Sequence, residues 1–243
     1  MGCKSVRVQG NRAFGVLISA SVALVLFVSP ATAGQSPGLG QAKAALLVKS
    51  DFPSGWSAQG SVKTSHGGGV ASFFGSSQAQ DQLANCLGAS STLMGLNPPA
   101  VTSPNFQFQG GAWLVQDNVS IFPNAKLAQQ TYVLFTSAKT PACLAAALQG
   151  PARNGLVADF GKGATVGTIT ATAPNPLWLV PHSGGFTISL PVTIQGTTTT
   201  VVSTFLVMVR GRMAHEVSFT SVIPKPFSAS LAHHLAATAY TRI

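Results

Sequence analysis

The residues of this sequence that could carry chemistry are few and widely spaced. Its 243 residues include five acids and five histidines. Glu216 follows His215 directly in an expected strand, so the two side chains point to opposite faces and cannot form a dyad. The other acids are scattered through the chain: Asp51, Asp81, Asp117 and Asp159. No pair of acids can be assigned general acid and general base roles.

His215 is the histidine that most resembles a functional group. It shares one face of an alternating strand with Met213, Val217 and Phe219. A polar group on an apolar face needs a partner, which is either a ligand or another core residue. We therefore predict a ligand cleft where the sheet meets the helices, lined by Met213, His215, Val217 and Phe219, with Trp178 at its entrance. A core histidine would produce the same pattern.

The string His66-Gly67-Gly68-Gly69 resembles the stretch that supplies an oxyanion-hole amide in lipases and esterases. That fold also needs a G-x-S-x-G elbow on a strand-to-helix turn, and no such elbow stands on a turn of that kind here. We interpret the string as a glycine-rich loop. We predict a protein without enzymatic activity, and the alternative is a hydrolase of envelope ester or glycan bonds.

The composition excludes several classes of protein. Charged residues make up 8% of the chain, and 14 basic residues stand against 5 acidic ones. The basic residues form no run with interleaved aromatics, so we predict no nucleic-acid partner. No cysteine or histidine pairs have the spacing of a zinc site, so we predict neither a metal nor a cofactor.

The first 33 residues have the pattern of an export signal. Basic residues precede the apolar run Ala13 to Val28, and Ala31-Thr32-Ala33 is typical of a signal peptidase site. The run is shorter than the roughly 20 residues that span a bilayer. We expect cleavage after Ala33 and a protein that is secreted or held in the cell envelope. The alternative is a retained N-terminal membrane anchor.

Two cysteines remain after the expected cleavage, Cys86 and Cys143. An even pair in an exported protein is typical of a disulfide, because the compartment is oxidising. We predict that they are bridged. The alternative is two buried free thiols.

The rest of the chain predicts one domain of the α+β class. After a linker at 34–40, residues 41–243 begin with expected helices at 41–49 and 78–87. A strand is expected at 113–121, two helices between 124 and 148, and a final helix after Pro226. Residues 186–222 read as an antiparallel meander with tight turns at 195–197 and 210–212. We expect a single antiparallel sheet with helices packed on one face, and loops at 61–69 and 95–104.

The order of several motifs resembles a known family. A turn of the form D-[apolar]-P-x-G-W spans Asp51 to Trp56, and two cysteines flank a strand and the pattern Ala128, Tyr132, Phe135. A late hairpin carries Val209 to Met213. This arrangement is similar to the exported actinobacterial proteins related to the extracellular sensor domain of the mycobacterial kinase PknH. A second disulfide, common in that group, has no cysteine pair here.

The resemblance implies an α+β domain with a cleft between sheet and helices, and a role in ligand sensing at the cell envelope. Together with the scarcity of catalytic residues, it predicts a sensor-like binding module. The expected partner is an apolar or amphipathic small molecule, such as a lipid, or another envelope protein.

Overall fold

The fold was analysed in a computed structural model. It describes residues 38–66, 77–150, 152–153, 155, 157, 160–161, 163–222 and 226–243. The expected signal peptide at 1–33, most of the expected linker and Gly67 to Gly69 lie outside these residues. Within the described chain, α2 begins at Leu39, so part of the predicted linker is helical.

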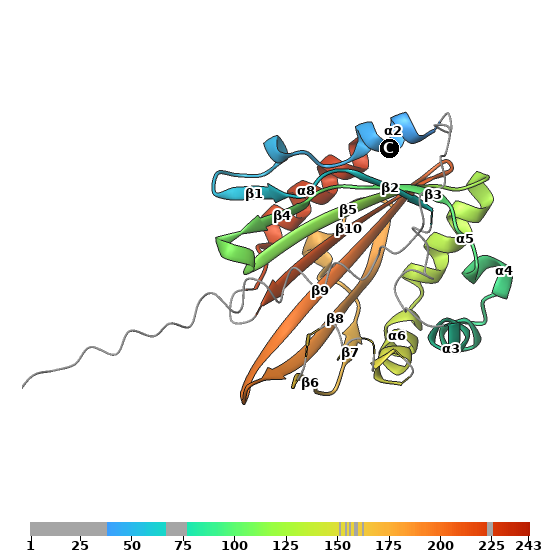
Figure 1. The fold of residues 1–243 in the computed structure, drawn as a ribbon. Coiled ribbons are helices and arrows are strands. Elements are labelled where there is room, and N and C mark those ends of the chain that lie inside the picture. The colour runs from blue at the N-terminus through green and yellow to red at the C-terminus, as the bar shows by residue number, and fades with distance from the viewer. Residues whose placement is uncertain are drawn as a thin grey trace, which may run out of the picture.

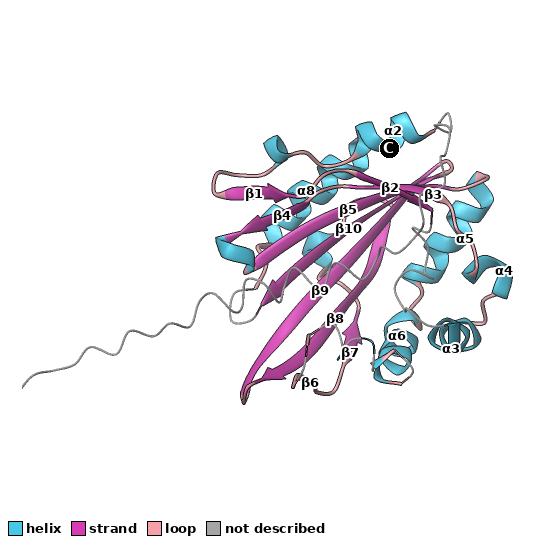
Figure 2. Cartoon of the chain, viewed as in Figure 1, coloured by secondary structure: helices cyan, strands magenta, loops and turns pink. Residues whose placement is uncertain are grey.

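Ten strands make up the sheet. They are β1 (Trp56–Gln59), β2 (Lys63–His66), β3 (Pro99–Thr102), β4 (Asn105–Phe108), β5 (Trp113–Ile121), β6 (Thr165–Val166), β7 (Thr170–Thr172), β8 (Ser183–Ile194), β9 (Thr197–Arg210) and β10 (Met213–Val222). Their main order is β1-β4-β5-β10-β9-β8-β6, while β3 joins β2 to β5 and β7 pairs with β8. Every pairing is antiparallel, which confirms the predicted single antiparallel sheet and the α+β class (Figure 2).

The helices lie before, between and after the strands along the chain. They are α2 (Leu39–Ala45), α3 (Ser77–Leu87), α4 (Ser91–Met94), α5 (Ala125–Thr136), α6 (Thr140–Gln149) and α8 (Ala229–Thr241), with short 3-10 turns η1 (Lys49–Asp51), η3 (Gln109–Gly111) and η4 (Pro176–Trp178). Asn124 caps α5 by accepting a hydrogen bond from the Leu127 N–H at 2.9 Å, and Ser228 caps α8 through the Leu231 N–H. None of the helices in the described part of the chain is long and apolar enough to cross a membrane.

The two faces of the sheet are named here after neighbouring residues of β10. On the His215 face, side chains such as Val119, Leu206 and Val217 pack under α2 and α8. On the Glu216 face, side chains such as Phe186 and Val207 pack under α3, α5 and α6. The sheet separates these two groups of helices (Figure 1). The prediction that helices cover one face only was therefore wrong.

Helices cover both faces of the sheet because its central strands carry apolar side chains on both sides. In β9, Leu206 and Val207 are consecutive and are both almost fully buried, at 0% and 3% exposure. A strand that is apolar on both faces must be covered on both. The helices near the middle of the sequence cover the Glu216 face. Their apolar stripes alone do not indicate which face of the sheet they pack against.

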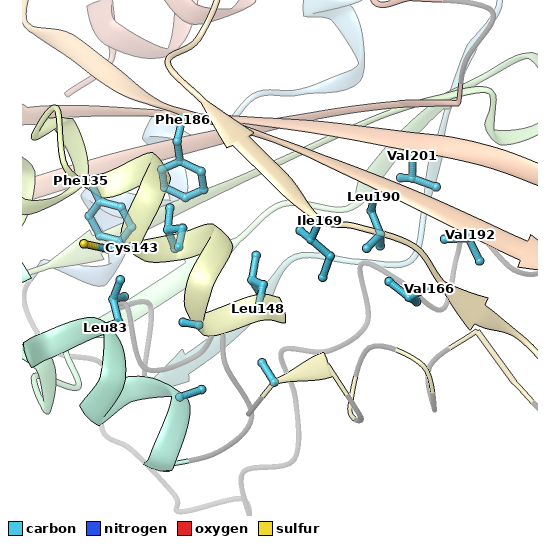
Figure 3. Packing of buried hydrophobic residues seen from close by; sticks show 14 of the residues in the cluster. Leu83, Phe135, Cys143, Leu148, Val166, Ile169, Phe186, Leu190, Val192 and Val201 are labelled. Atoms are coloured by element: carbon cyan, nitrogen blue, oxygen red, sulfur yellow. The ribbon is translucent and has the colours of Figure 1, made fainter. Parts of the chain in front are cut away.

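The disulfide joins the helices on the Glu216 face. Cys86 ends α3 and Cys143 lies in α6, with their Cα atoms 5.7 Å apart. The bridge confirms the predicted pairing. Cys143 belongs to a cluster of buried residues that fills the space between α6 and strands β7, β8 and β9 (Figure 3).

Two short strands replace predicted loops. Lys63–His66 and Pro99–Thr102 pair as β2 and β3 at one edge of the sheet, next to β5. Most of β2 is exposed and polar, so its sequence carries no apolar alternation. Pairing with a neighbour, rather than burial, makes it a strand, and that pairing is not visible in the local sequence.

Candidate functional site

Asp117 and His215 form a buried pair at the centre of the His215 face. Strand β10 pairs with β5 so that His215 stands opposite Val119, one diagonal step from Asp117. His215 Nε2 donates to Asp117 Oδ2 at 2.8 Å, and both side chains are 0% exposed. The inward histidine therefore has a protein partner. This is a correction to the view of Asp117 as one of several scattered acids.

The same carboxylate holds the N-terminal segment against the sheet. Asp117 Oδ2 also accepts a hydrogen bond from the Leu47 N–H at 2.9 Å. The backbone of Asp117 is bonded in turn to Ser103, whose hydroxyl accepts from the Asp117 N–H at 3.0 Å. Because Leu47 and His215 bond to its carboxylate and Ser103 bonds to its backbone, we interpret Asp117 as a structural residue.

The residues predicted to line a cleft lie in the core of the His215 face. Val217 and Phe219 are at most 1% exposed, and Trp178 of η4 packs against Phe219 with ring centroids 5.5 Å apart. Met213 is half-buried beside α2. A ligand would reach His215 only if this cover opened, so the cleft at these residues stays a prediction.

Glu216 lies on the opposite face and has a very different environment. It stands between Asn118 of β5 and Val207 of β9 in the register of the sheet. Its carboxyl group makes no hydrogen bond or ion pair with any residue that the structure describes. Burial without compensation raises the pKa of its carboxyl from the ordinary 4.5 to about 7. Groups with strongly shifted pKa values cluster at functional sites, which makes Glu216 a candidate.

The polar side chains around Glu216 are bonded to one another. The Asn118 amide donates to Thr102 Oγ1 at 2.7 Å, and the Ser120 hydroxyl donates to Asn118 Oδ1 at 3.1 Å. The Ser218 hydroxyl donates to the Gln116 carbonyl at 3.0 Å. These bonds fix the neighbours of Glu216 and leave its carboxylate oxygens as unused acceptors.

A second polar atom without a partner lies nearby. The register of β2, β3, β5 and β10 places Ser65, Ala100, Ser120 and Ala214 in the row next to that of Glu216. Ser65 Oγ is buried and has no hydrogen bond with any described residue. Buried polar atoms are normally satisfied, so an unpartnered Ser65 Oγ beside the half-buried Glu216 carboxyl is unusual. The His215 face also has such atoms among the described residues, namely Asp117 Oδ1, His215 Nδ1 and Trp178 Nε1.

The polar surface ends at β9. Phe205 and Val209 are partly buried there and pack against the large core cluster, together with Tyr132 of α5. Glu216 therefore lies on the boundary between a polar half of the face, over β3, β5 and β10, and an apolar half, over β8 and β9. We call Glu216, Asn118, Gln116, Ser120 and Ser218 the Glu216 surface.

Other residues considered from the sequence do not join this site. His66 ends β2 and its side chain is exposed, while the glycines that follow it lie outside the described residues. Asp51 forms an ion pair with Arg242 at 2.7 Å. Among the described residues, no three histidine, cysteine or acidic side chains are grouped closely enough to hold a metal ion.

Comparisons with known proteins identify no family. No family model matches the chain, and no curated protein matches it. Among solved structures, it is similar to the crystal structure of the extracellular domain of PknH from Mycobacterium tuberculosis. The TM-score is 0.43 at 13% sequence identity, and the match covers 86% of this chain and 98% of that one.

Proposed function

We propose that this protein is a non-enzymatic, sensor-like binding module of the cell envelope, and that it holds an amphipathic small molecule on the Glu216 surface. The observation that carries the proposal is the position of Glu216. It is a carboxyl without a partner, set where the polar half of a sheet face meets the apolar half. Binding sites combine an apolar lining with a few polar groups that orient the ligand.

The surroundings of Glu216 favour binding over catalysis. Glycoside hydrolysis needs two carboxyl groups within about 10 Å of each other on one site. The other acids that the structure describes are Asp51, Asp81 and Asp117, and none of them belongs to the Glu216 surface. Ester hydrolysis needs a nucleophile bonded to a base. The buried pair of His215 and Asp117 lies on the opposite face and carries no nucleophile.

Two features support a location outside the cytoplasm. The disulfide is typical of an oxidising compartment, and the first 33 residues have the pattern of a signal peptide. A ligand drawn from the envelope would present both a polar head and an apolar chain. The boundary at Glu216 offers a surface for each of these parts.

Native mass spectrometry of the exported protein tests this function. The wild-type protein should carry an additional mass that organic extraction removes, and Glu216→Ala should lose it. Asp81→Ala is the matched control, because Asp81 is an exposed acid in α3, and it should keep the ligand. Retention of the same mass by Glu216→Ala, or turnover of a generic ester by the wild-type protein, would contradict the proposal.

A further inference from the structure

The hydrogen-bonding capacity around Glu216 indicates what its ligand must supply. The neighbouring side-chain amide and hydroxyls each donate at least once to another protein atom: Asn118, Ser120 and Ser218. The carboxyl oxygens of Glu216 accept nothing from the described residues. The unused capacity that Glu216 offers is therefore that of an acceptor, and its partner must be a donor.

The charge of this surface indicates what kind of donor fits. The titratable side chains on the surrounding elements are Lys63 of β2, and Lys126 and Tyr132 of α5. Lys63 stands three strands away from Glu216 in the same cross-strand row, is exposed, and makes no ion pair with it. Asp117, His215 and Arg210 belong to the opposite face. Among the described residues, Glu216 is thus a carboxyl without a counter-charge.

We propose that Glu216 binds the protonated amine of its ligand, with the ligand's apolar chain lying toward Phe205 and Val209 of β9. This inference rests on the proposed function and specifies the chemical class of the ligand. A half-buried carboxylate gains most from a partner that brings both hydrogen-bond donors and a positive charge.

Two other ligands fit this surface less well. A neutral alcohol donates a hydrogen bond but leaves the carboxylate charge uncompensated. A divalent cation such as calcium takes six to eight oxygen ligands, most of them from carboxylates and carbonyls. Among the described residues, no second carboxylate belongs to the Glu216 surface, since Asp81 of α3 is exposed to solvent. The test therefore includes both as alternatives.

Calorimetric titrations with two matched probes test the inference. Octylamine and 1-octanol share the same chain, and the amine stays protonated across the range used, since alkylamines resemble lysine with a pKa of about 10. At pH 8, octylamine should bind at least tenfold more tightly than 1-octanol. Glu216→Gln should remove that advantage, and the control Asp81→Asn should keep it.

A pH series on the wild-type protein gives an independent measurement that needs no variant. Glu216 ionises with a pKa of about 7, so octylamine binding should weaken roughly 30-fold between pH 8 and pH 5.5. The affinity for 1-octanol should stay constant. Calcium chloride, added alone at pH 8, should give no Glu216-dependent heat.

The outcomes separate this inference from the proposed function. Equal binding of the two probes to the wild-type protein, or unchanged octylamine binding to Glu216→Gln, would overturn the inference that Glu216 binds an amine. A calcium-dependent heat signal that is lost in Glu216→Gln would show that the surface binds a metal ion rather than an amine. In each case a Glu216-dependent ligand mass in native mass spectrometry would still support the binding function, and its absence would end that function as well.

Discussion

Two carboxyl groups on adjacent central strands, one buried and one half-buried, illustrate two uses of an acid in a sheet. Asp117 in β5 is fully buried and bonded to His215 and Leu47. Glu216 in β10 faces the other side of the sheet and has no bonded partner among the described residues, and burial raises its pKa to about 7. Asp117 accepts from two segments through Oδ2, while its Oδ1 has no partner among the described residues. A carboxylate that accepts from two segments holds them together, whereas one that accepts from none is available to a ligand. The following predictions test this contrast.

The largest effect is expected at Asp117. Asp117→Ala leaves both the His215 Nε2 and the Leu47 N–H in the core without their acceptor. Breaking a buried pair from one side costs about 3–5 kcal/mol of the free energy of unfolding. Urea unfolding measures this loss. The exposed acid Asp81 provides the control, because Asp81→Ala should change stability by less than about 0.5 kcal/mol. An Asp117→Ala protein as stable as wild type would remove the basis for a structural role.

A somewhat smaller loss is expected at His215. His215→Leu removes one donor to Asp117 but keeps the hydrogen bond from the Leu47 N–H. It should therefore cost about 2–4 kcal/mol of the free energy of unfolding. His215→Gln keeps an N–H donor and should lose less. Thermal and urea unfolding of both variants measure the difference. If His215→Leu instead kept its stability and lost ligand, His215 would line a cleft after all.

Substitution of Glu216 should change stability in the opposite direction, because it should stabilise the protein. Its pKa is raised from 4.5 to about 7, so the folded protein holds this proton more tightly than the unfolded chain. The contribution of Glu216 to the free energy of unfolding should be fully present below pH 4.5 and should be lost as the pH rises to 7. Glu216→Gln removes this dependence, and at pH 8 it should be about 3 kcal/mol more stable than wild type.

Urea unfolding of both proteins at pH 4 and pH 8 measures this change. The two proteins should have similar stability at pH 4, where Glu216 is protonated in both the folded and the unfolded state. A Glu216→Gln protein that is less stable than wild type at pH 8 would show that the carboxylate has a stabilising partner.

The smallest effect concerns a third acid, Asp51, which is partnered like Asp117 but lies nearer the surface. Arg242 donates to both Asp51 oxygens and to the Leu46 carbonyl, with Arg242 27% exposed. Because solvent screens this pair, Arg242→Gln should cost only about 1 kcal/mol. A double-mutant cycle with Asp51→Asn isolates the coupling. A coupling free energy as large as the loss of stability in Asp117→Ala would mean that burial does not determine how much a bonded carboxylate contributes to stability.

The regular part of this fold could be predicted from the sequence. The alternation through residues 186–194 and 213–222 indicates the long strands, and Asn124 marks the start of α5. The role of Asp117 was harder to predict, although Asp117 alternates in phase with the inward residues Val115 and Val119. A carboxylate in such a position is unusual, and its partner is 98 residues away. Only the pairing of β5 with β10 brings them together.

Glu216 was predicted correctly to face away from His215, but its importance was not visible in the sequence. A glutamate in an alternating strand is normally exposed to solvent. Its burial depends on neighbours from β5 and β9, and its lack of a partner follows from bonds that Asn118 and Ser218 make elsewhere. These are properties of the assembled sheet.

The disulfide also determines how the chain responds to a stretching force. Cys86 and Cys143 are 57 residues apart, and the loop that they close contains the central strand β5. When the two ends of an oxidised molecule are pulled apart, these residues detach from the sheet but add nothing to the length of the tether. Reduction releases about 200 Å of further contour length, at about 3.5 Å per residue. The bridge therefore makes the protein shorter under load.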